Sequence, residues 1–194
     1  MSEQPFEIVT GPYEVYIAPV GESFAAVTSE PPGANWVLLG TSGADNTTED
    51  GVTLTMSETL EHFRSLGGTG IRKSFRTEED FLVGFLLADM TLEEWVRVLN
   101  FNTVSTDTND RTIPLYKGLD VATRALLIRG NDKSPYGTGF NMQFELPRVI
   151  PTGAPEVVFV KGAPAGLAVE FMALEDLDAA SDSERFGRIR ATFQ

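Results

Sequence analysis

Residues 79–101 constrain the fold more than any other stretch, because the longest apolar run of the chain is followed there at once by a helix signature. Both faces of the extended run 81–88 are apolar, which predicts a strand that is covered on both sides. Thr91 and Glu94 then have the spacing of a capping box. The next residues place one apolar stripe on a short helix: Leu92, Trp95, Val96 and Leu99. The stretch predicts a central strand and a helix that packs on a β core.

The remainder of the chain consists mostly of short strand-like segments separated by turns, some of which alternate apolar and polar residues. Such segments predict strands at residues 13–19, 35–40, 51–58, 112–117, 122–129, 140–146, 157–161, 167–174 and 185–193. No linker separates two cores, and 194 residues are enough to bury one. We therefore expect a single mainly β domain, residues 1–194, with about nine or ten strands and one helix.

Two segments are expected to project from the core. Residues 1–11 form a polar N-terminal arm that ends at Gly11-Pro12. Residues 41–78 combine an acidic loop, an alternating strand and a Gly-rich segment that is basic in an otherwise acidic chain. Compact domains seldom keep long excursions without using them. We predict that 41–78 is a protruding loop or hairpin that serves interaction more than the core.

Composition excludes several classes of function. The chain has 15 basic and 28 acidic residues, a net charge of −13, which is the wrong sign for gripping nucleic acid through its phosphates. It has no cysteine and one histidine, so disulfides and thiolate metal sites are excluded. No apolar run reaches the length of a membrane span, and no secretory signal opens the sequence. We expect a protein that is made in a cytoplasm and does not enter a membrane.

No motif in the sequence assembles a catalytic site. The segment GGTGIRKS at residues 67–74 is similar to a phosphate-binding loop, but Arg72 stands where that motif needs glycine, and a polar stretch follows in place of a helix. His62 has no nucleophile and acid to join. We expect no enzymatic activity, no metal and no cofactor.

The order of these features resembles the major tail tube proteins of long-tailed, siphovirus-like bacteriophages. The resemblance rests on the opening YEVYIAPVGESF, the segment NWVLLG, the loop leading to EDGVTL, and the Gly-rich basic excursion that ends in RTEED. The resemblance also includes the apolar strand, the helix that begins with LEEW, the segment EFMAL and the closing strand. Together these segments span residues 13–193.

This resemblance implies a β-sandwich or rolled β-barrel with one flanking α-helix and a long protruding loop. It implies hexameric rings that stack into a tail tube through which DNA is ejected. The partners would be further copies of the chain, the tape measure protein, and the tail terminator and distal tail proteins, with DNA only as transient cargo. The protein would belong to the virion tail and be assembled in the cytoplasm of the host bacterium.

Two sets of residues are candidates for contacts in such a tube. We expect Arg64, Arg72, Lys73 and Arg76 of one ring to meet an acidic surface that includes Glu175 and Asp176 of the next. The polar face of the clearest alternating strand, Asn141, Gln143 and Glu145, is expected to line the lumen. The alternatives are a ring-forming tail terminator or head decoration protein, and a β-barrel that binds a small ligand.

Overall fold

The computed structural model describes residues 8–27, 32–40, 47–131, 133–137, 139–162 and 164–193. This part of the chain is mainly β with a single α-helix, which confirms the predicted fold class. The helix is α1 (Leu92–Val98), and a short 3-10 helix (Asp182–Glu184) precedes the last strand. The strands are β1 (Glu14–Ala18), β2 (Val37–Leu38), β3 (Thr47–Arg64), β4 (Ile71–Leu87), β5 (Ser105–Thr106), β6 (Arg111–Thr112), β7 (Arg124–Gly130), β8 (Met142–Thr152), β9 (Leu167–Ala173) and β10 (Arg188–Ala191).

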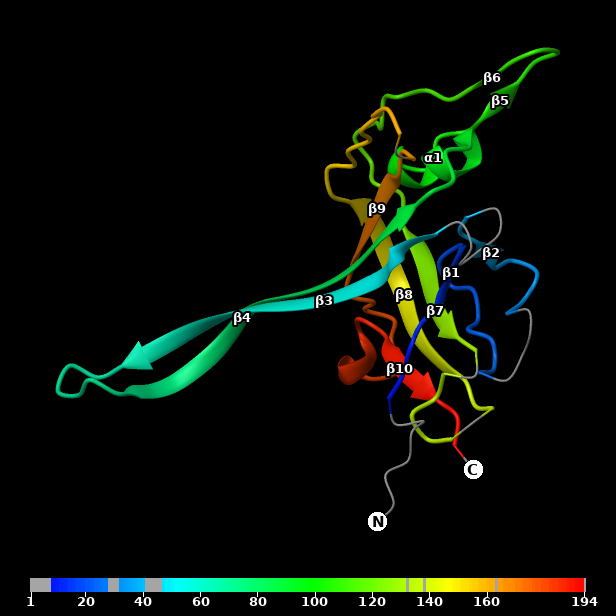
Figure 1. The fold of residues 1–194 in the computed structure, drawn as a ribbon. Coiled ribbons are helices and arrows are strands. Elements are labelled where there is room, and N and C mark those ends of the chain that lie inside the picture. Colours follow the sequence, from blue (N-terminus) through cyan, green and yellow to red (C-terminus); the bar gives the residue numbers. More distant parts are fainter. Residues whose placement is uncertain are drawn as a thin grey trace.

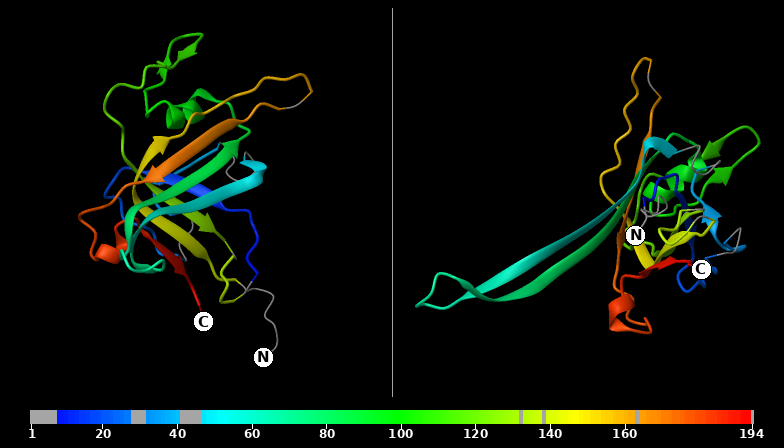
Figure 2. Two further views of the ribbon diagram at one scale, coloured as in Figure 1. Left: turned by 90° about the vertical axis from the view of Figure 1, so that its left-hand side faces the viewer. Right: turned by 60° about the horizontal axis from the view of Figure 1, so that its bottom comes forward.

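Eight strands form one rolled antiparallel sheet in the order β2-β1-β7-β8-β9-β4-β3, with β10 attached to β8 (Figures 1 and 2). β9 and β10 lie along the same edge of β8. β9 pairs with its C-terminal half, from Val149 to Thr152, and β10 with its N-terminal half, from Met142 to Glu145. The sheet therefore forks at β8 into one branch made of β9, β4 and β3 and a second branch made of β10.

The main core lies on the inner face of this sheet, between its strands and α1. In β4, Val83, Phe85 and Leu87 point into the core and are buried. The fully buried positions of this core come from β4, β7, β8 and β9: Val83, Leu87, Leu126, Val149, Leu167 and Phe171. On the opposite face of β4, Leu82 and Leu86 are only half-buried. The predicted burial of this strand on both sides is therefore wrong.

A second apolar cluster covers the outer face of β1 and β7. It consists of Tyr16, Ala18, Trp36, Ala125 and Leu127, with Phe24 and Leu38 packed against it. The indole N–H of Trp36 donates to the carbonyl of Ser23 at 3.2 Å, and the rings of Trp36 and Phe24 lie 5.3 Å apart. These contacts hold the chain around Phe24 against the sheet, so that β1 and β7 are covered on both faces.

The first turn of α1 differs from the predicted capping box. Thr91 is the N-cap residue, but its side chain makes no capping hydrogen bond; its N–H donates to Asp89 Oδ1 at 3.0 Å. Glu94 is buried instead, and its Oε2 lies 3.8 Å from Nε of Arg97. Among the described residues, no helix has the length and apolar character needed to cross a membrane.

Several predicted boundaries are also wrong. Residues 47–50, expected in a loop, begin β3, and 157–161 form no strand. Within 112–117 only Thr112 belongs to a strand. The chain that follows is held by two side chains: the amide of Asn100 donates to the carbonyls of Lys117 and Asp120, and that of Asn102 to those of Pro114 and Tyr116. Residues 1–7 and 41–46, parts of the two predicted projecting segments, lie outside the described residues.

Candidate functional site: a two-stranded arm and a groove at its root

The most prominent feature of the molecule is a ribbon of two strands that leaves the body (Figures 1 and 2). β3 and β4 pair continuously from Val52 and Phe85 in the body to Arg64 and Ile71 near the tip, with bulges along the way. β9 accompanies β4 only from Leu82 to Leu87. We call residues 57–80 the arm. At roughly 3.3 Å per residue, its strands extend about 25 Å beyond the body.

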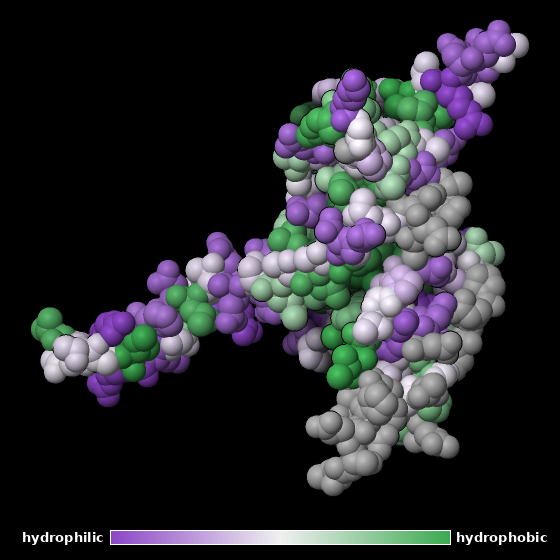
Figure 3. Space-filling model, viewed as in Figure 1, coloured by the Kyte–Doolittle hydropathy of each residue, from purple (hydrophilic) through white to green (hydrophobic). Residues whose placement is uncertain are grey.

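The arm exposes apolar side chains that a solvated ribbon does not need. They are Leu60, Phe63, Leu66, Ile71 and Phe75, with exposed fractions of 43%, 55%, 108%, 47% and 48%. Figure 3 shows apolar patches at the tip and along the arm between polar ones. An isolated two-stranded ribbon is marginally stable in water, and clustered exposed apolar groups mark contact surfaces. The arm therefore has the properties of a segment whose apolar side chains are covered by a partner molecule.

The four predicted basic contact residues all lie on this arm, but they differ in what they contact. Arg76 is engaged by the acidic root of its own arm, 2.7 Å from Glu58 and 3.5 Å from Glu79. Arg64 donates to the carbonyl of Thr69 in the tip turn. Lys73 lies over the ring of Phe75 at 5.0 Å.

Arg72 has no hydrogen-bond or ion-pair partner within the described part of the chain. Arg72 and Lys73 are thus the cations best placed to meet a partner.

The predicted acidic contacts lie in the connection between β9 and β10, residues 174–187, which we call the acidic loop. Asp176 accepts from Arg148 Nε at 3.0 Å, and Glu175 lies 3.6 Å from Arg185. The most exposed carboxylates of the loop are instead Asp178 and Asp182, whose side chains are 88% and 92% exposed. Within one molecule the arm points away from this loop, so the structure does not bring the basic and acidic sets together.

The predicted lumen-lining set is not an exposed polar face. Gln143 and Glu145 are buried, with 0% and 1% of their surface exposed, and Asn141 is half-buried. Gln143 Oε1 accepts two hydrogen bonds from Arg129, at 2.7 and 3.1 Å. Glu145 accepts from Arg188 at 2.7 Å and from Arg190 at 3.2 Å. Side chains enclosed in this way do not present a surface to a channel, and the prediction is wrong for Gln143 and Glu145.

The buried polar side chains hold residues 25–27 against the sheet by hydrogen bonds. The side-chain amides of Asn141 and Gln143 donate to the carbonyls of Val27 and Ala25, at 2.9 and 3.0 Å. Arg129 donates to the carbonyl of Ala26 at 3.1 Å. The sequence holds a signal for this arrangement, because Arg129 follows an apolar run in β7 and β10 alternates arginine with apolar residues. Glu145→Lys would place a cation beside Arg188 and Arg190 in this enclosed position.

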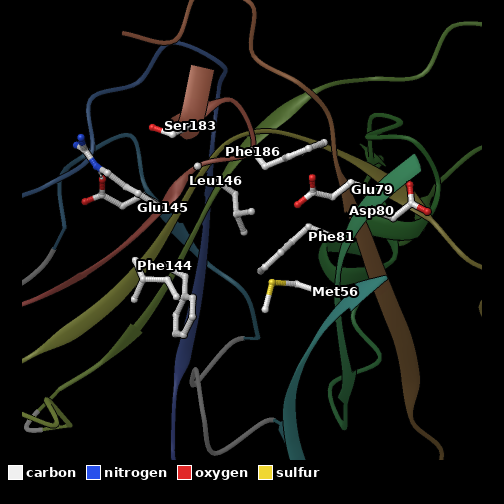
Figure 4. Close-up of a pocket in the computed structure, with 12 residues that line it drawn as sticks. Met56, Glu79, Asp80, Phe81, Phe144, Glu145, Leu146, Ser183 and Phe186 are labelled. Carbon is white, nitrogen blue, oxygen red and sulfur yellow. Dashed lines mark hydrogen bonds and ion pairs between the residues drawn. The ribbon is translucent and has the colours of Figure 1, made fainter. Parts of the chain in front are cut away.

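Sequence reasoning missed a groove at the fork of the sheet, next to the root of the arm (Figure 4). We call it the fork groove; its volume is about 220 Å³. Met56 and Phe81 form one wall, and Phe144, Leu146, Phe186 and Ile189 form the other. Met56 and Ile189 are 76% and 60% exposed. The groove exists because β4 leaves the sheet at Phe81 and, in the described part of the chain, no strand lies between it and β10.

Comparisons with known proteins place few limits on the function. No protein-family model matches the chain, and no curated protein matches it. Among solved structures, it is similar to a chain of the six-fold-symmetrised cryo-EM structure of the anti-feeding prophage baseplate, with 10% identity and a TM-score of 0.45. That match covers 100% of this chain and 98% of the other. A type six secretion system protein matches with 10% identity and a TM-score of 0.33, over 84% and 80% of the two chains.

Proposed function

We propose that this chain is a structural subunit that polymerises through its arm. The observation that carries the proposal is the β3–β4 ribbon, which exposes five large apolar side chains far from any core of its own. A contact surface of this kind is stabilised when another molecule covers it. The protein does no enzymatic chemistry in this proposal; its function is mechanical.

The shape of the molecule favours open-ended assembly over a symmetric dimer. The arm of one copy must contact a different surface of the next, because the arm and the body present unlike groups. Such head-to-tail contacts generate rings when the rotation closes and filaments when it does not. Protruding arms that bridge from copy to copy therefore suit a repeating ring or tube.

We further propose that the assembly is the tail tube of a bacteriophage, built from stacked hexameric rings. The tube would enclose the tape measure protein during assembly and conduct DNA during ejection, with tail terminator and distal tail proteins at its ends. The net charge of −13 supports this use, because a negative conduit repels phosphates and lets DNA pass without binding it.

Electron microscopy of the purified protein at increasing concentration tests this proposal. Hexameric rings and stacked tubes are the expected particles. Closed rings that never stack, or cages, would favour a terminator or decoration protein. A protein that stays monomeric at every concentration, and also when mixed with preformed tail tips, would contradict the proposal.

A further inference from the structure

The arm and the fork groove are unlike surfaces of one molecule, and each supplies what the other lacks. We propose that the fork groove of one copy is the seat for the tip of the arm of a second copy, with Leu66, Phe63 and Ile71 of the tip entering between the two apolar walls. This inference rests on the proposed function and names the surface that receives the arm.

The apolar groups on the two sides are complementary. Leu66 is fully exposed at the tip turn, with Phe63 and Ile71 beside it at 55% and 47%. The groove offers Met56 and Ile189 as exposed apolar walls over the half-buried rings of Phe81 and Phe186. Seating the tip would remove both apolar surfaces from water at once.

The charges around the two surfaces are of opposite sign. The distal arm, residues 60–76, has four basic residues and one acidic residue. The groove is lined by three carboxylates, Glu79, Asp80 and Glu145, and by one cation, Arg188. In Figure 4 the carboxylate of Glu79 points into the space between the two walls. The acidic loop beside it holds five carboxylates and one arginine, Arg185. Arg72 and Lys73 would reach this rim as the tip enters, and such complementarity steers the encounter and fixes its register.

The occupant must come from another molecule. The arm leaves the body beside the groove and extends outward, so that its tip lies well away from its own groove (Figures 1 and 2). Met56 and Phe81, which root the arm, are also one wall of the groove. A tip that enters the groove therefore packs against the root of the next arm, and each contact supports the following one.

Two single substitutions separate the two halves of the proposed contact. Leu66→Asp removes the apolar tip and leaves the groove intact, whereas Ile189→Lys repels a basic tip and leaves the arm intact. Each variant alone should need at least a tenfold higher concentration to elongate. A mixture should form complexes joined by one arm–groove contact and stop there, as measured by light scattering after size exclusion. The controls are Leu119→Asp and Val158→Lys, which change residues of 93% and 54% exposure that belong neither to the arm nor to the lining of the groove.

Photo-crosslinking identifies the seat directly, because the chain contains no cysteine. Benzophenone-maleimide on Leu66→Cys should capture peptides of the fork groove or the acidic loop, and the same probe on Ser183→Cys should capture the arm tip. Normal tubes with capture of other segments would overturn the inference and leave the proposed function standing. Loss of elongation by Leu119→Asp as strongly as by Leu66→Asp would also overturn it. Failure of the unmodified protein to assemble would overturn both proposals.

Discussion

The two halves of the β3–β4 hairpin have the same backbone pairing and opposite surroundings. Near the body, Val83, Phe85 and Leu87 of β4 are buried in the core, while in the arm Phe75 and Ile71 of the same strand are about half-exposed. The difference begins where β9 stops pairing with β4. A third strand and a core stabilise the proximal half, and the distal half has neither. The comparison teaches that strand formation alone does not show what a strand packs against.

Charged groups of the arm and the body differ in the same way. The ion pair of Arg76 with Glu58 is about half-exposed on both sides. In the body, Glu145 is enclosed and accepts hydrogen bonds from two arginines. Exposed pairs of the first kind contribute little to stability, whereas a buried charge that loses its partners costs much more. We therefore expect substitutions in the body to change folding and those in the arm to change assembly.

The largest expected difference concerns two phenylalanines. Phe171 is fully buried and packs near Phe85, with ring centroids 6.4 Å apart. Phe171→Ala should lower the free energy of unfolding by about 3–5 kcal/mol because it leaves a cavity. Phe75→Ala in the arm should change it by less than about 0.5 kcal/mol. Urea unfolding at a concentration too low for assembly measures both values, and equal losses would place the arm in the folding core.

The next difference concerns two glutamates. Glu145→Gln removes the negative charge that two arginines contact, and it weakens the hydrogen bond that the Gln143 amide donates to this side chain. We expect the free energy of unfolding to fall by about 1–3 kcal/mol. Glu61→Gln makes the same change on the exposed arm, where less than about 0.5 kcal/mol is expected. The measurement is again urea unfolding. An unchanged stability for Glu145→Gln would mean that this side chain faces solvent, as a lumen-lining residue would.

The smallest expected effect is a pH dependence that only the body should show. Burial raises the pKa of Glu94, and the charge of Arg97 opposes this in part, while Asp89 and Glu93 add to it. The folded state then holds a proton that the unfolded chain releases, so the unfolding free energy falls as the pH rises from the ordinary pKa of a glutamate through the raised one. Glu94→Gln should remove this decline, measured by unfolding between pH 4 and 7. Glu93→Gln, on the exposed side of the helix, is the control. If the unfolding free energy of Glu94→Gln still declines as the pH rises, another titrating group causes the decline.

The sequence predicted much of this fold from local pattern. The mainly β class, the helix after the apolar run and the strands at residues 167–174 and 185–193 follow from alternation and apolar spacing. The basic, Gly-rich segment was assigned to a projecting excursion, and the structure has the tip of the arm there. Predicted boundaries were wrong where pairing with a distant strand decides the structure. Residues 157–161 are rich in β-branched residues but pair with no strand among the described residues.

The site residues could be predicted less well, for a physical reason. Polar residues on an alternating strand indicate a face that differs from the core, but they do not show what covers that face. Gln143 is covered by Arg129 and the carbonyl of Ala25, and Glu145 by Arg188 and Arg190, all of them distant in the sequence. The fork groove depends on the point at which β4 leaves the sheet, and no local pattern encodes that point.

The arm itself offers the most direct test of the central claim that it exists for assembly and not for folding. Met56 and Phe81 face each other in the ribbon, so replacing residues 57–80 with Asn-Gly closes the hairpin at its root with a two-residue turn. Electron microscopy and size exclusion with light scattering of this variant, beside the full chain, give the answer. We predict a monomer that unfolds cooperatively with nearly the stability of the full chain at low concentration, while the full chain forms rings or tubes. Tubes formed by the shortened protein, or its failure to fold, would contradict the account.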